Sequence, residues 1–272
     1  MYKRQVSVSG QIRDFGFDEW ETIKSSTSGS TEQYDVPKGL YGTSNPGIMT
    51  INEMFGSNLP ELFSYTVSPV EGQSGKAAKL QTVYTYMFLN GMDFNALLGG
   101  LVPYVTAGSL FTGIFKTDMN NTLNSTKFGV PFVGEPATFT GYYKYTPGTT
   151  YYNNKNEVVA DKTDECSIYA VLYEELLDEE NNNIPLNGDY NDPDLYIGSS
   201  KRIVMKAVLE DGTAKSDWTK FSIPFKLLEG KSYDATKKYY LAIVCSSSAE
   251  GDYFMGAPGS TLFIDSFTVT PQ

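Results

Sequence analysis

The sequence predicts an all-β protein, a jelly-roll β-sandwich of two antiparallel sheets. Short runs of β-branched and aromatic residues recur along the chain, each bounded by Gly, Pro, Asn or Asp. No helical periodicity persists for more than about two turns. The 272 residues are 40% hydrophobic and 14% aromatic, with no shift in composition that would mark a second domain. We therefore expect an N-terminal linker or edge strand (residues 1–14) and one sandwich domain (residues 15–272).

The first half of the chain alternates turn-rich segments with strand signals. Residues 25–31 and 39–48 are rich in Ser, Thr, Gly, Asn and Pro and are predicted to form loops or turns. Residues 59–70 fit a helical turn followed by a short strand. Strands are expected within 72–86 and at 107–115, where apolar and polar residues alternate.

Two segments, 136–148 and 164–175, carry the strongest strand signal. Both are rich in aromatic and β-branched residues, and we expect them to be neighbouring antiparallel strands in the middle of one sheet. Because side chains alternate along a strand, the second segment has two distinct faces. One face suits the core (Cys166, Ile168, Ala170, Leu172), and the other is half aromatic and half polar (Ser167, Tyr169, Val171, Tyr173).

The remaining chain continues the same pattern. An acidic loop is expected between 174 and 196, because that stretch is dominated by Asp, Glu and Asn. Strands are predicted at 201–212, 217–228, 238–248 and 261–270, with a Gly-rich loop before the last one.

Charge and residue usage exclude several functions. The chain has 32 acidic and 21 basic residues, a net charge of −11, which disfavours binding to nucleic acid. It contains no histidine, so catalysis by His-based triads and imidazole metal sites are excluded. No run of 18 apolar residues predicts a membrane span, and no signal peptide is visible, as in a mature or trimmed chain. Cys166 and Cys245 fit two buried free thiols better than a disulfide, although neighbouring strands would permit one.

Seven segments together resemble the putative carbohydrate metabolism domain (PCMD) family. They are FDEW (17–20), GKAAKLQT (75–82), AGSLFTGIF (107–115), PATFTGYYKYTPG (136–148), DECSIYAVLYE (164–174), DWTKFSIPF (217–225) and the segment 246–267. The family is similar in fold to jelly-roll carbohydrate-binding modules, and is frequent in surface and periplasmic proteins of polysaccharide-degrading gut anaerobes. The resemblance implies an exported protein of the periplasm or outer-membrane surface, lipid-anchored in its full-length precursor, with a poly- or oligosaccharide as partner.

Glycan recognition would use aromatic rings, on which the apolar faces of sugars stack, beside polar groups that bind sugar hydroxyls. Packing within the sheets is the alternative role for each tyrosine. The candidate residues lie on the two central segments, the early loops and the late loop: Tyr142, Lys144, Tyr169 and Tyr173; Trp20, Tyr41 and Asn45; Asp252 and Tyr253.

A structural Ca²⁺ is a further expectation. Carbohydrate-binding jelly rolls often join an early acidic residue to a late strand aspartate around this ion, which prefers oxygen ligands. Here Asp18 or Glu19 and Asp265 are the candidate ligands. Ordinary solvated carboxylates are the alternative.

Binding without cleavage is the function that we expect. The first alternative is a glycoside hydrolase, which needs two Asp or Glu side chains about 5 to 9.5 Å apart. Glu135, Asp164, Glu165 and Asp252 are candidates for such a pair, but the sequence selects no two of them. The second alternative is a structural or adhesive surface protein. A cleft with two close carboxylates would indicate the hydrolase, whereas an aromatic face without them favours binding.

Overall fold

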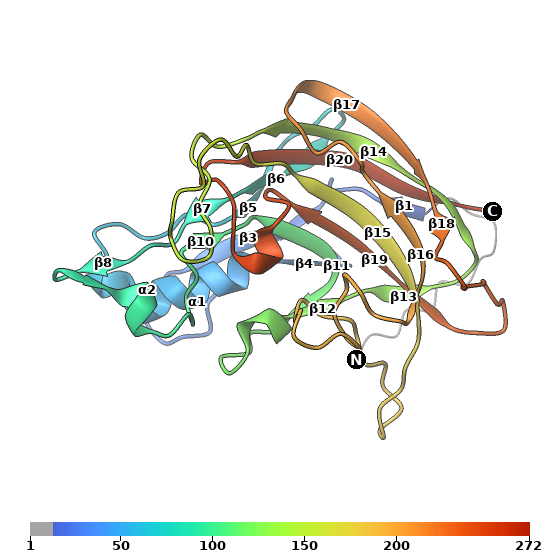
Figure 1. The fold of residues 1–272 in the computed structure, drawn as a ribbon, viewed down its shortest axis with the longest axis horizontal. Coiled ribbons are helices and arrows are strands. Elements are labelled where there is room, and N and C mark those ends of the chain that lie inside the picture. Colours follow the sequence, from blue (N-terminus) through green and yellow to red (C-terminus); the bar gives the residue numbers. More distant parts are fainter. Residues whose placement is uncertain (1–12) are drawn as a thin grey trace.

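Two antiparallel sheets lie face to face and form the body of the molecule in the computed structural model, which describes residues 13–272 (Figure 1). Strands account for 43% of the residues and helices for 10%. The prediction of an all-β sandwich is confirmed. Part of the predicted N-terminal segment, residues 1–12, lies outside the described residues, and β1 (Arg13–Phe15) pairs with the last strand.

The sheets contain six and eight strands, and every pairing between their strands is antiparallel. The six-stranded sheet has the order β17 (Lys215–Pro224), β14 (Pro136–Thr146), β20 (Thr261–Pro271), β6 (Lys76–Gln81) and β5 (Val67–Glu71), with β1 beside β20. The eight-stranded sheet has the order β12 (Thr126–Phe128), β11 (Ser109–Phe115), β19 (Tyr239–Ser246), β15 (Ser167–Glu174), β16 (Ile203–Val208) and β18 (Lys226–Leu227). In that sheet β13 (Val130–Phe132) also pairs with β19, and β4 (Tyr41–Thr43) with β11.

Smaller elements extend from the sandwich. They are the ladders β2 (Trp20–Lys24) with β3 (Gln33–Pro37), β7 (Val83–Tyr84) with β10 (Val105–Thr106), and β8 (Phe88–Leu89) with β9 (Met92–Asp93), the helices α1 (Asn45–Phe55) and α2 (Phe94–Leu97), and the 3₁₀ turns η1 (Gly56–Asn58), η2 (Thr122–Ser125) and η3 (Gly251–Tyr253). Figure 1 shows β7 to β10 and both α-helices at one end of the molecule. In the part that the structure describes, no helix has the length and hydrophobicity to cross a membrane.

Helix α1 corrects the prediction of turns across residues 39–48. Pro46 lies in its first turn, where a missing N–H costs nothing because that group has no intrahelical partner. Ile48 and Ile51 are buried against Met87 and Val102 in a small core of their own. The helix therefore depends on tertiary packing, and the Pro-Gly pair at its start reads as a turn in the sequence alone.

The two central segments do not pair with each other, contrary to the prediction. β14 lies between β17 and β20, whereas β15 lies between β19 and β16 in the opposite sheet. The chain crosses repeatedly from one sheet to the other, and strand signals do not reveal which sheet a strand joins. The two segments meet through their inner faces, where Tyr143 packs in the same core as Ile168 and Leu172.

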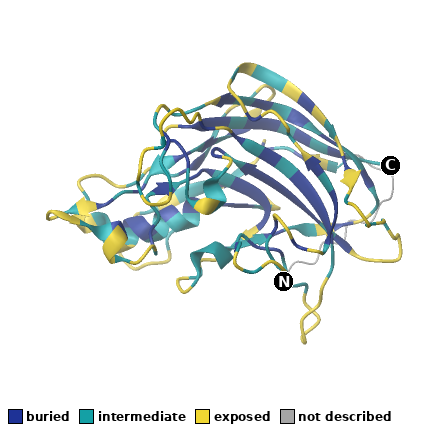
Figure 2. Cartoon of the chain, in the orientation of Figure 1, coloured by how far each residue is buried: buried dark blue, intermediate teal, exposed yellow. Residues whose placement is uncertain are grey.

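Both faces of β15 are largely buried, as Figure 2 shows along the central strands. Its inner face carries Ile168, Ala170 and Leu172 into the main core, together with Cys166 just before the strand, as the alternation predicts. Cys166 and Cys245 are free thiols within that core, and burial raises the pKa of Cys166 to about 12.

The outer face of β15 ends in a second core that includes Tyr173. Its ring is fully buried with Leu186 and Ile197 from the segment that covers the sheet, and Arg202 lies 5.0 Å from the ring centre. The Tyr173 hydroxyl donates a hydrogen bond of 2.6 Å to the carbonyl of Phe128. Tyr173 is therefore a packing residue, which corrects its prediction as a sugar contact.

We predict that Tyr173→Ala lowers the free energy of unfolding by about 3 to 5 kcal/mol, because it opens a cavity in a closed core. Tyr142→Ala is the matched control, because Tyr142 lies half-buried on the outer face of the other sheet, and it should cost about 1 kcal/mol. Urea unfolding followed by tryptophan fluorescence measures both. Equal losses for the two variants would contradict this assignment.

Candidate functional site

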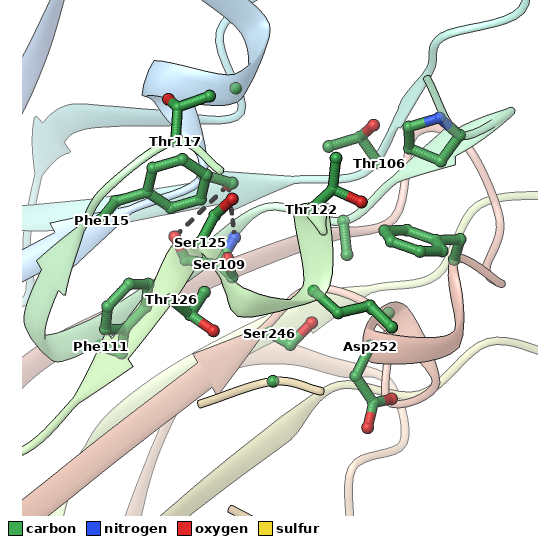
Figure 3. A pocket seen from close by; sticks show the side chains of 18 of the residues that line it. Thr106, Ser109, Phe111, Phe115, Thr117, Thr122, Ser125, Thr126, Ser246 and Asp252 are labelled. Carbon is green, nitrogen blue, oxygen red and sulfur yellow. Dashed lines mark hydrogen bonds between the residues drawn. The ribbon is translucent and has the colours of Figure 1, made fainter. Parts of the chain in front are cut away.

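The outer face of the eight-stranded sheet carries a cavity of about 260 Å³ (Figure 3). Its floor includes Phe111 of β11, Tyr169 of β15 and Ser246 of β19. The walls come from α1, from the segment 101–107, from the segment around η2 and from the loop that contains η3. The cavity therefore begins on the outer face of β15 where the packing around Tyr173 ends.

The cavity lining is mostly apolar surface, interrupted by hydroxyl groups. Among the described residues, its only ionisable side chains are Asp252, Tyr169 and Tyr196, and no Lys or Arg lines it. A site without a cation has nothing to neutralise an anionic ligand, so this composition favours a neutral one. The hydroxyl groups belong to Ser44, Thr50, Thr106, Ser109, Thr117, Thr122, Ser125, Thr126, Ser167 and Ser246.

Asp252 provides the one carboxylate of the cavity and sits in η3. The hydroxyl of Tyr196 donates a hydrogen bond to its Oδ2 atom. Burial raises the pKa of Asp252, and burial together with the nearby Asp252 charge raises the pKa of Tyr169 and of Tyr196. Both phenols therefore stay protonated at neutral pH. The Tyr196 proton is already donated to Asp252, so Tyr169 is the phenol whose hydroxyl can donate to a ligand.

The loop that carries Asp252 is fixed by another carboxylate, Asp164, which is 2% exposed. Oδ2 of Asp164 accepts hydrogen bonds from the hydroxyls of Ser248 (2.6 Å) and Ser260 (2.7 Å) and from the N–H of Ala257 (2.8 Å). Its Oδ1 atom accepts from the N–H of Glu165 at 2.9 Å. Asp164 is thus a structural residue, and it does not line the cavity.

The structure brings two of the predicted sugar contacts, Tyr169 and Asp252, into this cavity. Tyr253 lies beside Asp252 on the same turn but points to the surface, where it is 39% exposed. Its ring stacks on Tyr190, with the ring centres 5.0 Å apart. These residues form one candidate site, although they come from distant parts of the chain.

The predicted contacts in the early loops hold the fold together instead. Asn45 is fully buried: its Nδ2 atom donates to the carbonyl of Val67 (2.7 Å) and its Oδ1 atom accepts from the N–H of Val67 (2.9 Å). The indole of Trp20 donates to the carbonyl of Phe17, and the hydroxyl of Tyr41 donates to that of Phe15. Trp20, Tyr41 and Asn45 therefore lie apart from the cavity, and their polar groups are already occupied.

Tyr142 and Lys144 face away from the cavity altogether. They alternate with the buried Tyr143 and so project from the outer face of the six-stranded sheet, on the opposite side of the sandwich. The Lys144 ammonium lies 4.8 Å from the ring centre of Trp218 and 4.9 Å from that of Phe263. The predicted platform from both central segments is therefore wrong, because the two segments belong to different sheets.

No pair of carboxylates lines the cavity in the described part of the chain. Glu135 and Glu165 lie outside its lining, as does Asp164. Hydrolysis by the usual two-carboxylate mechanism would need a second Asp or Glu beside Asp252. The cavity instead offers one carboxylate acceptor, the Tyr169 hydroxyl as a donor and further hydroxyl groups around an apolar floor.

The predicted calcium ligands are brought together in part. Asp265 is 2% exposed and accepts the N–H of Ser74 (3.0 Å), while Asp18 accepts the N–H of Lys76 (3.1 Å), so both carboxylates meet the turn between β5 and β6. Gly75 contributes to this approach, because a side chain there would collide with the Asp18 carboxylate. Glu19 turns away toward Lys38. Within residues 13–272 no three Asp, Glu or Cys side chains form a metal-binding group, so backbone carbonyls would have to complete the coordination.

Most residues of the cavity wall carry no sequence pattern that predicts a site. Tyr196 lies in a loop for which only its acidic composition was informative. Met54 and Phe55 belong to α1, whose start carries turn signals in the sequence. The alternation in β11, which places Ser109 and Phe111 on one side, is the one signal that could have located the floor.

Fold and site together define an antiparallel β-sandwich with a mostly apolar cavity, interrupted by hydroxyl groups, on the outer face of its larger sheet. The chain belongs to the family described as "Putative carbohydrate metabolism domain", which it matches over residues 16–270. The family is therefore carbohydrate-related, as the resemblance implies. No curated protein matches the chain.

Two solved structures are similar over nearly the whole chain. One, from Bacteroides thetaiotaomicron, is described as a putative glycoside hydrolase; it is 29% identical, with a TM-score of 0.74, over 98% of this chain and 72% of that one. The other, from Bacteroides vulgatus, carries the same description; it is 26% identical, with a TM-score of 0.69, over 95% of this chain and 98% of that one.

The raised pKa of Asp252 predicts a pH-dependent effect of Asp252→Asn. The native state takes up this proton at higher pH than the unfolded chain, so the carboxylate destabilises the fold increasingly as the pH rises from about 4 through the raised pKa. The asparagine keeps an acceptor for Tyr196 but carries no charge. The melting temperature of the variant relative to wild type should therefore increase between about pH 4 and pH 7. A difference that does not change with pH, or that falls, would contradict the assignment.

Proposed function

We propose that this protein binds a neutral poly- or oligosaccharide in the cavity on the eight-stranded sheet and does not cleave it. The observation that carries this proposal is the composition of the cavity: a mostly apolar surface interrupted by hydroxyl groups, with one carboxylate and no cation among its described lining residues. Membership of a carbohydrate-related family supports a saccharide as the ligand.

Each part of a sugar has a counterpart in the cavity. The C–H face of a pyranose can pack on Phe111 or Phe115, as apolar groups pack on aromatic rings. Its hydroxyls can donate to Asp252 and to the hydroxyl oxygen of Tyr196, and they can accept from the hydroxyl of Tyr169. A hydrogen bond to a charged group is stronger than one between neutral groups, so Asp252 would contribute most to affinity and orientation.

A glycoside hydrolase is the second candidate, and the two Bacteroides relatives with that description favour it. The raised pKa of Asp252 suits a general acid. This reading needs a second carboxylate at the cavity, which the described lining residues do not supply. A purely structural or adhesive role would require neither the cavity nor its carboxylate.

Export to the periplasm or outer-membrane surface, with a lipid anchor on the full-length precursor, completes the proposal. It is supported by the resemblance to a family of surface and periplasmic proteins in gut anaerobes and by the Bacteroides origin of both relatives. Cell fractionation of the native host, with the protein detected by antibody, tests this location.

The binding test combines a glycan array with calorimetry on the best ligand. Asp252→Ala should weaken binding about tenfold or more, because it removes a charged acceptor from a partly buried site. Asp217→Ala is the control, because Asp217 is exposed on the six-stranded sheet, and it should bind like wild type. A reducing-sugar assay on the same glycan distinguishes the two candidates.

Two results would contradict the proposal. Release of reducing ends by wild type but not by Asp252→Asn would establish the hydrolase. If Asp252→Ala binds the same glycan with the affinity of wild type, the glycan does not bind in this cavity.

We also propose that Asp18 and Asp265 hold a structural Ca²⁺ at the turn between β5 and β6. Within residues 13–272, Asp265 is buried and forms no ion pair with a Lys or Arg, and both carboxylates already point at the same backbone turn. Bound Ca²⁺ would join the start of the domain to its last strand. Its role here would be stability, because this turn contributes no residue to the cavity.

Millimolar Ca²⁺ should therefore raise the melting temperature of chelator-treated protein, since a ligand that binds only the native state stabilises it. Asp265→Asn should abolish the rise, and Glu19→Gln, at an exposed residue paired with Lys38, should preserve it. A melting temperature that does not respond to Ca²⁺ in metal-free wild type would remove this ion from the account.

A further inference from the structure

Four aromatic rings form a continuous row, with a fifth beside it, at the end of the molecule where β7, β8 and β10 lie (Figure 1). Tyr152 stacks on Tyr84 with ring centres 5.0 Å apart, and Tyr84 lies 5.6 Å from Tyr86. Tyr86 in turn lies 6.1 Å from Phe88 and 5.8 Å from Tyr104. We call these five residues the tyrosine row. None of them lines the cavity.

The tyrosine row faces solvent. Along residues 84–88, Thr85 and Met87 are buried, at 0% and 1% exposure, whereas Tyr84 and Tyr86 are half-buried and Phe88 is 60% exposed. A monomeric protein rarely exposes a continuous aromatic surface without a function, because such a surface gains from being covered.

Polar groups hold the hydroxyl tips of the row in place. The Tyr84 hydroxyl donates to Oδ1 of Asn156 (2.5 Å), and the Tyr104 hydroxyl donates to Oδ2 of Asp93 (3.0 Å). Asp93 also caps α2 by accepting the N–H of Ala96 at 3.0 Å. The rings are therefore positioned before any ligand arrives, which reduces the entropy lost on binding.

The chemistry around the row selects among ligands that stack on aromatic rings. Single-stranded nucleic acid also stacks, but it requires a positively charged groove. Here the carboxylates of Asp93 and Glu157 lie at the row or on its flanking turn, in a chain of net charge −11. The rings lie against one another, with Tyr152 stacked on Tyr84 and the remaining pairs tilted by 33 to 43°. Phe88 at the exposed end of the row is the ring that can pack against the apolar face of a sugar.

From this geometry we infer that the tyrosine row is a second binding site, at which a neutral, linear polysaccharide packs a sugar ring on Phe88 and contacts the neighbouring rings with further sugar units. The inference shares the carbohydrate ligand of the proposed function but does not depend on the cavity. The two sites are neighbours, because Pro103 and Thr106 line the cavity and Tyr104 between them belongs to the row.

Native affinity electrophoresis in gels with soluble xylan, glucomannan or hydroxyethyl cellulose tests the inference. Wild type should be retarded by at least one of these polymers. Phe88→Ala and Tyr86→Ala should each raise the dissociation constant about tenfold, as truncation of an aromatic anchor does at a binding surface. Tyr86→Phe keeps the ring and should bind like wild type. Because Phe88 is exposed, Phe88→Ala leaves the fold intact even if Tyr86→Ala does not.

Leu97→Ala is the matched control. Leu97 is 67% exposed on neighbouring α2 but lies outside the row, so its loss should not change retardation. If Leu97→Ala weakens binding as much as Phe88→Ala, the surface is a general apolar patch suited to a protein partner, and the inference is overturned. It is also overturned if no polymer retards wild type, or if both row variants bind unchanged.

Failure of the cavity proposal gives a different result. Asp252→Ala should still be retarded by the polymer, and Phe88→Ala should still bind short oligosaccharides in calorimetry. Loss of only one behaviour identifies which site is wrongly assigned.

Discussion

The buried carboxylate of Asp164 is the interaction on which the candidate site most depends. Burying a charge without a partner is costly, and here the cost is offset by four hydrogen bonds, three of them to the chain at 248–260. That chain includes η3, which carries Asp252 over the outer face of the eight-stranded sheet. Burial raises the pKa of Asp164. Protonation of this carboxylate at acidic pH would weaken the hydrogen bonds that it accepts. The cavity wall held by these bonds would then become less rigid.

The second constraint is that β15 is buried on both faces. Its inner side chains fill the main core, while its outer side chains divide between a closed core around Tyr173 and the open cavity around Tyr169. One strand therefore connects stability and recognition. Ile168 and Ala170, on either side of Tyr169, pack into the main core and hold the strand in place. The cavity floor is therefore preformed before a ligand binds.

Local sequence patterns predicted the strands and the two faces of β15, because both depend on neighbouring residues. Alternation in 166–173 correctly separated the two faces of β15, and short strands with turn signals gave the sandwich. The sheet to which each strand belongs could not be predicted. The sequences of β14 and β15 are both rich in aromatic and β-branched residues, yet the two strands lie in opposite sheets. That error placed Tyr142 and Lys144 beside Tyr169. Asn45 and Tyr173 are of residue types common in sugar sites, and only their burial shows that their polar groups serve the fold. Asp252 was identified as a candidate, whereas its partner Tyr196 lay in a loop without any pattern.

The central claim is that the outer face of the eight-stranded sheet recognises a saccharide through Asp252 and Tyr169. A crystal structure with an oligosaccharide, chosen from the glycan array and soaked at saturating concentration, tests it most directly. The account predicts sugar density in the cavity, with a hydroxyl within hydrogen-bonding distance of the Asp252 carboxylate. An empty cavity beside a sugar bound elsewhere on the molecule would contradict it.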